Sequence, residues 1–126
     1  MPFVKGPMTP GRPVGLTLYV TDSASAIGFY ESALGMRWNS EVLSFQFGTY
    51  PRDDFFLVSI LDPTDEPDHP AGTGHFSFVV EDLASAHRHA LAAGAVEWYL
   101  PTDNPGAPRS SGFWDPDRNR VELWQA

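Results

Sequence analysis

An internal repeat constrains the fold of this chain more than any other feature of its sequence. When the sequence is laid against itself, the segment LYVTDSASAIGFY (18–30) aligns with FVVEDLASAHRHA (78–90). The identical pairs are Val20 and Val80, Asp22 and Asp82, Ala24 and Ala84, Ser25 and Ser85, and Ala26 and Ala86, and Trp38 then meets Trp98. A repeat of this length indicates a structural unit that is built twice and buries its apolar face against its own copy.

Each copy predicts one strand, one helix and three further strands. The opening strands, 15–21 and 75–81, alternate in polarity and are rich in β-branched and aromatic residues. An aspartate before each helix can accept hydrogen bonds from free backbone N–H groups, and a glycine ends each helix. The predicted helices are 23–34, between Asp22 and Gly35, and 83–93, between Asp82 and Gly94. The other strand candidates are 36–40, 43–48, 55–61, 96–100, 111–114 and 120–124.

These patterns predict an α+β fold in which two βαβββ modules form a cupped mixed sheet with the helices on the outer face. We expect a single domain over residues 14–126, with modules at 14–61 and 74–125. The proline-containing residues 1–13 are expected to form an N-terminal arm. The turn-rich segment 101–111 is expected to be a loop, as is the linker between the modules.

Composition excludes several classes of function. Sixteen acidic residues against eight Lys and Arg give a formal charge of −8, which disfavours binding to nucleic acid or to an anionic membrane. This charge would attract a cationic ligand, or it serves only solubility. No cysteine is present, so disulfides, thiol catalysis and zinc–thiolate sites are excluded. Neither a signal peptide nor an apolar run long enough to span a bilayer is visible. We therefore expect a cytoplasmic protein.

Period-two alternation separates the residues that face the helices from those that face the open side of the sheet. The residues expected on the open side are Gly15, Thr17, Tyr19, Phe55, Leu57, Ser59, His75, Ser77, Val79, Arg120, Glu122 and Trp124. Trp38 and Trp98 are expected in the core, because that is the usual place of tryptophans in strands. His87 and His89 are expected to be packing or surface residues.

His75 and Glu122 are the most informative polar pair on the open side. An imidazole and a carboxylate on neighbouring strands suit a divalent first-row metal. They suit equally a hydrogen-bonded pair in a polar cavity, and the sequence leaves both interpretations open.

Three segments carry a resemblance to a known family: FYESALG (29–35), GHFSFVVED (74–82) and FWDPDRNRVELW (113–124). They resemble the vicinal-oxygen-chelate superfamily of glyoxalase I, extradiol dioxygenases, fosfomycin-resistance enzymes and bleomycin-resistance proteins. The resemblance implies paired βαβββ modules and a homodimer. In metal-dependent members, it also implies ligands at the positions held here by Gly15, Ser59, His75 and Glu122. Arg118 replaces the glycine that is usual in the D-P-D-G-N turn, which costs about 1 kcal/mol if that position needs positive φ.

Two functions follow from the resemblance. The first is a binding protein that sequesters an aromatic or planar natural product, as in bleomycin resistance, and needs no obligatory cofactor. The predicted ligand-binding residues are Tyr19, Phe55, Leu57, Ser59, His75, Glu122 and Trp124. The second is a lyase, isomerase or dioxygenase that acts on vicinal oxygens, with a divalent metal (Zn, Ni, Fe or Mn) on His75 and Glu122. In a variant of this enzyme no metal is used, and Glu122 is the catalytic acid or base. A third possibility is a role that lies only in the dimer surface.

Overall fold

The structure is a computed structural model and describes residues 13–65, 67–68, 70–72 and 74–126. The first module contains β1 (Gly15–Tyr19), α1 (Ser23–Leu34), β2 (Trp38–Asn39), β3 (Ser44–Phe47) and β4 (Phe56–Leu61). The second contains β5 (His75–Val80), α2 (Leu83–Ala92), β6 (Val96–Asn104), β7 (Ala107–Trp114) and β8 (Arg120–Gln125). Their four-stranded sheets have the equivalent orders β1-β4-β3-β2 and β5-β8-β7-β6. The predicted α+β fold of two βαβββ modules is confirmed.

Both helices begin where the sequence predicts. The side chain of Asp22 accepts a hydrogen bond from the Ser25 backbone N–H at 3.3 Å, and Asp82 does the same for Ser85 at 3.1 Å. The first helix ends at Gly35, which adopts a left-handed conformation with φ of 64°. The second helix ends at Ala92, one residue earlier than predicted.

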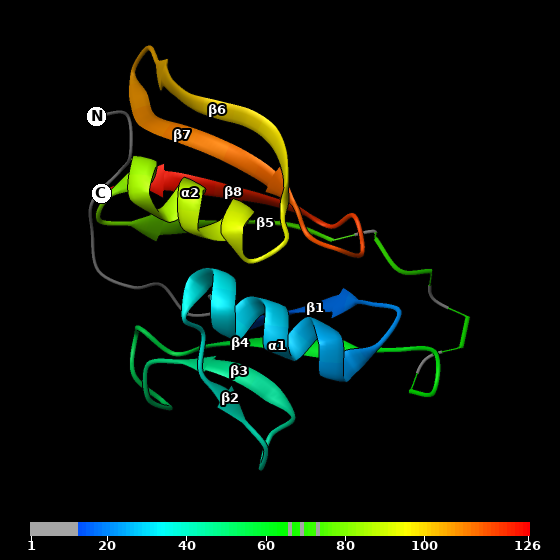
Figure 1. Ribbon diagram of the computed structural model, residues 1–126. Coiled ribbons are helices and arrows are strands. Elements are labelled where there is room, and N and C mark those ends of the chain that lie inside the picture. The colour runs from blue at the N-terminus through cyan, green and yellow to red at the C-terminus, as the bar shows by residue number, and fades with distance from the viewer. Residues whose placement is uncertain (1–12, 66, 69, 73) are drawn as a thin grey trace.

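The core lies between the helices and one face of the sheets. Figure 1 shows α1 and α2 side by side on the same face. Most of the residues that alternation assigns to this face are almost completely buried, among them Leu18, Val20, Val58, Ile60, Val121 and Leu123. Leu16, Phe78 and Val80 are partly buried against them. The opposite face carries no helix (Figure 1), and on it Val79 and Val96 are 68% and 62% exposed. The apolar strand face therefore determines which side the helices cover.

The two modules contact each other through α1 and α2, and their edge strands β1 and β5 lie nearest one another and run in opposite directions (Figure 1). Leu16 of β1 and Phe78 of β5 line one apolar cavity of about 300 Å³. Nearer the other end of the pair, the Gly72 N–H donates to the carbonyl oxygen of Tyr19 at 3.2 Å. The antiparallel arrangement places Gly15, the first residue of β1, and His75, the first residue of β5, at opposite ends of this contact.

A buried hydrogen bond also joins the modules. The hydroxyl of Tyr30 on α1 donates to Asp115 Oδ2 at 2.6 Å. Asp115 holds the turn between β7 and β8, because its Oδ1 accepts from the backbone N–H groups of Asp117 and Asn119, both at 2.8 Å. Burial, reinforced by the Asp115 charge, raises the pKa of Tyr30 well above its usual value. The helix of one module is thereby tied to the most distinctive turn of the other.

The prediction of a loop at 101–111 is wrong. Strand β6 continues through Pro101 to Asn104, and β7 begins at Ala107 after a tight turn at Pro105 and Gly106. Pro101 is tolerated because β6 is an edge strand, and Pro108 lies on the part of β7 that extends beyond its pairing with β8. The predicted N-terminal arm lies outside the described residues apart from Pro13. Within the described part of the chain, no helix is long and apolar enough to cross a membrane.

Candidate functional site

An irregularity in β6 places two aromatic side chains on the open face of the C-terminal module. Glu97 pairs with Phe113 and Tyr99 pairs with Gly112, so an extra residue, Trp98, lies between consecutive pairs of the ladder. Both rings lie over Gly112, where an added Cβ would come within 2.6 Å of either ring. A β-bulge has this effect because it interrupts the strict alternation of side chains. The expectation that Trp98 packs in the core is wrong, because its ring lies on the open face against His75 and Trp114, whereas Trp38 packs against the core at Phe45.

The open face carries a cluster of aromatic rings. The ring centroids of Trp98 and Trp114 lie 5.7 Å apart, and Trp98 meets Tyr99 edge to face at 5.2 Å. His75 lies against the edge of this cluster, 5.7 Å from Trp98. The Arg120 guanidinium lies 5.1 Å from the Trp98 ring and 4.8 Å from the Trp114 ring. These side chains form a partly exposed aromatic cluster in which the Trp98 and Trp114 rings are tilted by 42° and the Arg120 cation lies over both.

A chain of hydrogen bonds crosses the same face. Glu122 Oε1 lies 3.1 Å from His75 Nε2, and Glu122 Oε2 accepts from the Tyr99 hydroxyl at 2.8 Å. Ser110 Oγ lies 2.8 Å from the Tyr99 oxygen and accepts from Asn104 Nδ2 at the same distance. Desolvation, with a contribution from Glu122, raises the pKa of Tyr99, so its hydroxyl remains a donor at neutral pH. The chain fixes the tyrosine ring beside the indoles.

The residues that the sequence predicts for the site fall into two groups. His75, Glu122 and Trp124 lie on β5 and β8 of the C-terminal module, and the first two are in contact. The other four, Tyr19, Phe55, Leu57 and Ser59, belong to the N-terminal module.

In that module Ser59 Oγ lies 2.8 Å from Ser44 Oγ, and Phe55 meets Tyr50 edge to face at 5.3 Å. Strict alternation could not have placed Trp98 and Tyr99 on the same face, although the strand glycine Gly112 is a sequence signal for a bulge or for a close contact.

The side chains present do not complete a metal centre of the family's type. Gly15 has no donor side chain, Ser59 is bonded to Ser44, and both oxygens of Glu122 are engaged by His75 and Tyr99. Among the described residues, no three or more His, Cys, Asp or Glu gather in a group that could hold an ion. Gly15 and His75 also lie at opposite ends of the contact between modules. The side chains of one chain therefore do not provide enough free ligands to hold a metal ion of the kind that the family binds.

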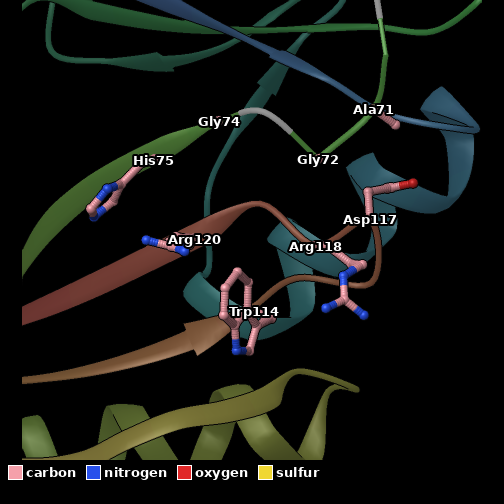
Figure 2. Close-up of a pocket in the computed structure, with 8 residues that line it drawn as sticks. All are labelled: Ala71, Gly72, Gly74, His75, Trp114, Asp117, Arg118 and Arg120. Atoms are coloured by element: carbon pink, nitrogen blue, oxygen red, sulfur yellow. The ribbon is translucent and has the colours of Figure 1, made fainter.

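A pocket of about 500 Å³ adjoins the aromatic cluster at the start of β5 (Figure 2). Its lining residues are Ala71, Gly72, Gly74, His75, Trp114, Asp117, Arg118 and Arg120. Arg118 has φ of 70°, so the predicted conformational cost of about 1 kcal/mol at this position applies. Its guanidinium lies 5.8 Å from the Trp114 ring.

The comparison with protein families identifies the class to which this fold and site belong. The model of the glyoxalase/bleomycin resistance protein/dioxygenase superfamily matches residues 12–123. The chain belongs to this superfamily, as the resemblance in its sequence predicted. No curated protein matches the sequence.

Solved structures show the same fold. A superfamily member from Sphaerobacter thermophilus is 22% identical with a TM-score of 0.69, over 92% of this chain and 98% of that chain. TnmS3, an antibiotic-binding protein from Streptomyces sp. CB03234, is 21% identical with a TM-score of 0.65, over 94% and 98%. An integron cassette protein from V. cholerae is 25% identical with a TM-score of 0.63, over 95% and 98%.

Proposed function

We propose that this protein binds a planar or aromatic small molecule on the open face of its C-terminal module, without an obligatory metal. The observation that carries the proposal is the bulge that turns Trp98 and Tyr99 to the same side, next to Trp114. A core role for these rings would require them to face the helices. The likeness in fold to the antibiotic-binding TnmS3 supports a sequestering role.

The proposed interaction is stacking on aromatic rings combined with hydrogen bonds at their edge. Stacking of a flat ligand on Trp98 and Trp114 contributes about 0.5–1.5 kcal/mol per ring pair beyond the burial of area. Glu122 and His75 offer a polar edge that can orient the ligand. Because the Tyr99 ring is held by hydrogen bonds to Glu122 and Ser110, little side-chain entropy is lost on binding.

Tryptophan fluorescence provides the test. Anthracene-2-carboxamide, a planar probe without charge, is titrated into the protein in the presence of EDTA. We expect saturable quenching that is unchanged by the chelator and weakened about tenfold or more in Trp98→Ala, a loss of about 1.4 kcal/mol or more. The matched control is Trp38→Phe, because Trp38 packs on Phe45 outside the proposed site. Binding that disappears with EDTA, or that depends equally on both tryptophans, would contradict the proposal.

The proposal includes a homodimer. The open face exposes the large apolar side chains Val79 and Val96, which a second copy would cover. Within one chain, the predicted site residues of the N-terminal module, including Leu57 and Ser59, lie away from His75. In a dimer, the second copy would place its own Leu57 and Ser59 near His75. Sedimentation equilibrium should give twice the chain mass. Val79→Lys should shift the equilibrium to the monomer, whereas a monomeric wild-type protein at micromolar concentration would contradict this part.

One observation favours a second candidate, a metal-dependent lyase, isomerase or dioxygenase. His75 Nε2 and Glu122 Oε1 lie 3.1 Å apart on the open face, and a partner chain could complete their donor set. Metal analysis of untagged protein discriminates between the candidates. Near-stoichiometric zinc, nickel, iron or manganese that is lost in His75→Ala would favour the enzyme.

A further inference from the structure

The pocket beside the aromatic cluster has a local charge opposite to that of the whole protein. The chain carries a formal charge of −8, yet this pocket is lined by two guanidinium groups, Arg118 and Arg120, and by one carboxylate, Asp117. Neither arginine has a carboxylate partner within salt-bridge distance among the residues that the structure describes. Both contact indole rings instead.

The carboxylate at the pocket does not neutralise these arginines. Asp117 Oδ1 accepts a hydrogen bond from the Thr21 backbone N–H at 2.8 Å. Figure 2 shows the Asp117 carboxyl pointing away from the guanidinium groups of Arg118 and Arg120. The nearby Glu122 is bonded to His75 and Tyr99. The positive charge of the pocket is therefore locally uncompensated.

The backbone at Arg118 gives an independent reason to assign a role to this side chain. Its φ of 70° lies in the left-handed region, which glycine adopts without strain and arginine does not. A strained residue beside a pocket is a reason to look for function there. The guanidinium is well suited to binding carboxylate or phosphate, because it presents several N–H donors in one plane.

We propose that Arg118 and Arg120 bind an anionic group, a carboxylate or a phosphate, carried by the aromatic ligand. This inference rests on the proposed function and names its ligand class: a planar aromatic body over Trp98 and Trp114 and an acidic substituent in the adjoining pocket. Because the net charge of the protein repels anions at long range, recognition depends on these local contacts.

The test uses a pair of probes that differ in charge, anthracene-2-carboxylate and anthracene-2-carboxamide. We expect the wild-type protein to bind the carboxylate about tenfold more tightly, as expected for one charge-assisted hydrogen bond. Arg118→Gly and Arg120→Met should each abolish most of that preference, measured as the ratio of the two dissociation constants. Glycine suits the left-handed position, and methionine retains an apolar stem over the indoles. Arg88→Gln, an exposed change on α2, is the charge-matched control and should leave both affinities unchanged.

A second measurement separates failure of this inference from failure of the proposed function. Inorganic phosphate at constant ionic strength should raise the melting temperature of the wild-type protein and have no such effect on the double variant Arg118→Gly/Arg120→Met. Equal binding of both anthracene probes would overturn the anion site and leave the proposed function intact. If neither probe binds but phosphate stabilises only the wild type, the aromatic site is overturned and the anion site stands. Failure of all three ligands would overturn both.

Discussion

The substitution Gly112→Ala tests whether the bulge in β6 determines the geometry of the site. An added Cβ would lie 2.6 Å from Trp98 and 2.6 Å from Tyr99, whereas carbon atoms pack at about 3.5–4.0 Å. The rings would have to move by roughly 1 Å. Such a movement strains the bonds of the Tyr99 hydroxyl to Glu122 and Ser110, each 2.8 Å long.

We expect Gly112→Ala to lower the free energy of unfolding by about 1–3 kcal/mol, the usual range for overpacking. The matched control is Gly28→Ala in the middle of α1, where nothing lies within 4 Å of an added Cβ. That change should raise stability by about 0.5–1 kcal/mol, because alanine favours the helix over glycine. Urea unfolding followed by circular dichroism measures both changes.

The fluorescence titration completes this test, because displaced rings should also bind anthracene-2-carboxamide more weakly. If Gly112→Ala were as stable as the wild type and bound the probe equally well, the two rings would not lie over Gly112 as described. The account of the site would then be refuted.

Three further predictions concern the turn between β7 and β8 and its contact with α1. Tyr30→Phe should lower the free energy of unfolding by about 1.5–3 kcal/mol in urea titrations, because it removes a buried hydrogen bond to the Asp115 carboxylate. Since burial raises the pKa of Tyr30, the contribution of this residue to the free energy of unfolding should be fully present below about pH 10 and be lost as the pH rises further. Urea unfolding at high pH should show this loss of stability in the wild type and not in Tyr30→Phe. Arg118→Gly should raise stability by about 1 kcal/mol in thermal unfolding, and a decrease would contradict the assignment of strain to that residue.

The features of the fold that repeat along the chain could be predicted from the sequence. Period-two alternation correctly placed Leu18 and Val58 on the helix side and His75 and Glu122 on the open side. The paired aspartate caps located the starts of both helices. These features depend on local hydrogen bonding and on which face is apolar, and the order of the residues determines both.

Features that depend on pairing between strands could not be predicted. The bulge at Trp98 is set by the register of β6 against β7, which a single strand does not specify, so the turning of Tyr99 to the same face as Trp98 could not be predicted. The prolines at 101 and 108 indicated a loop, because their tolerance, on the edge strand β6 and on the end of β7 beyond its pairing with β8, depends on the sheet around them. The opposite directions of β1 and β5, which separate Gly15 from His75, likewise come from the packing of the modules.

The most direct test of the central claim follows the indole N–H signals of the four tryptophans by nuclear magnetic resonance during titration with anthracene-2-carboxamide in the presence of EDTA. We predict large, saturable shifts for Trp98 and Trp114, and a nearly unchanged signal for Trp38, which packs against Phe45. Shifts that vanish with the chelator, or that affect Trp38 as strongly as Trp98, would contradict a metal-independent aromatic site on the open face of the C-terminal module.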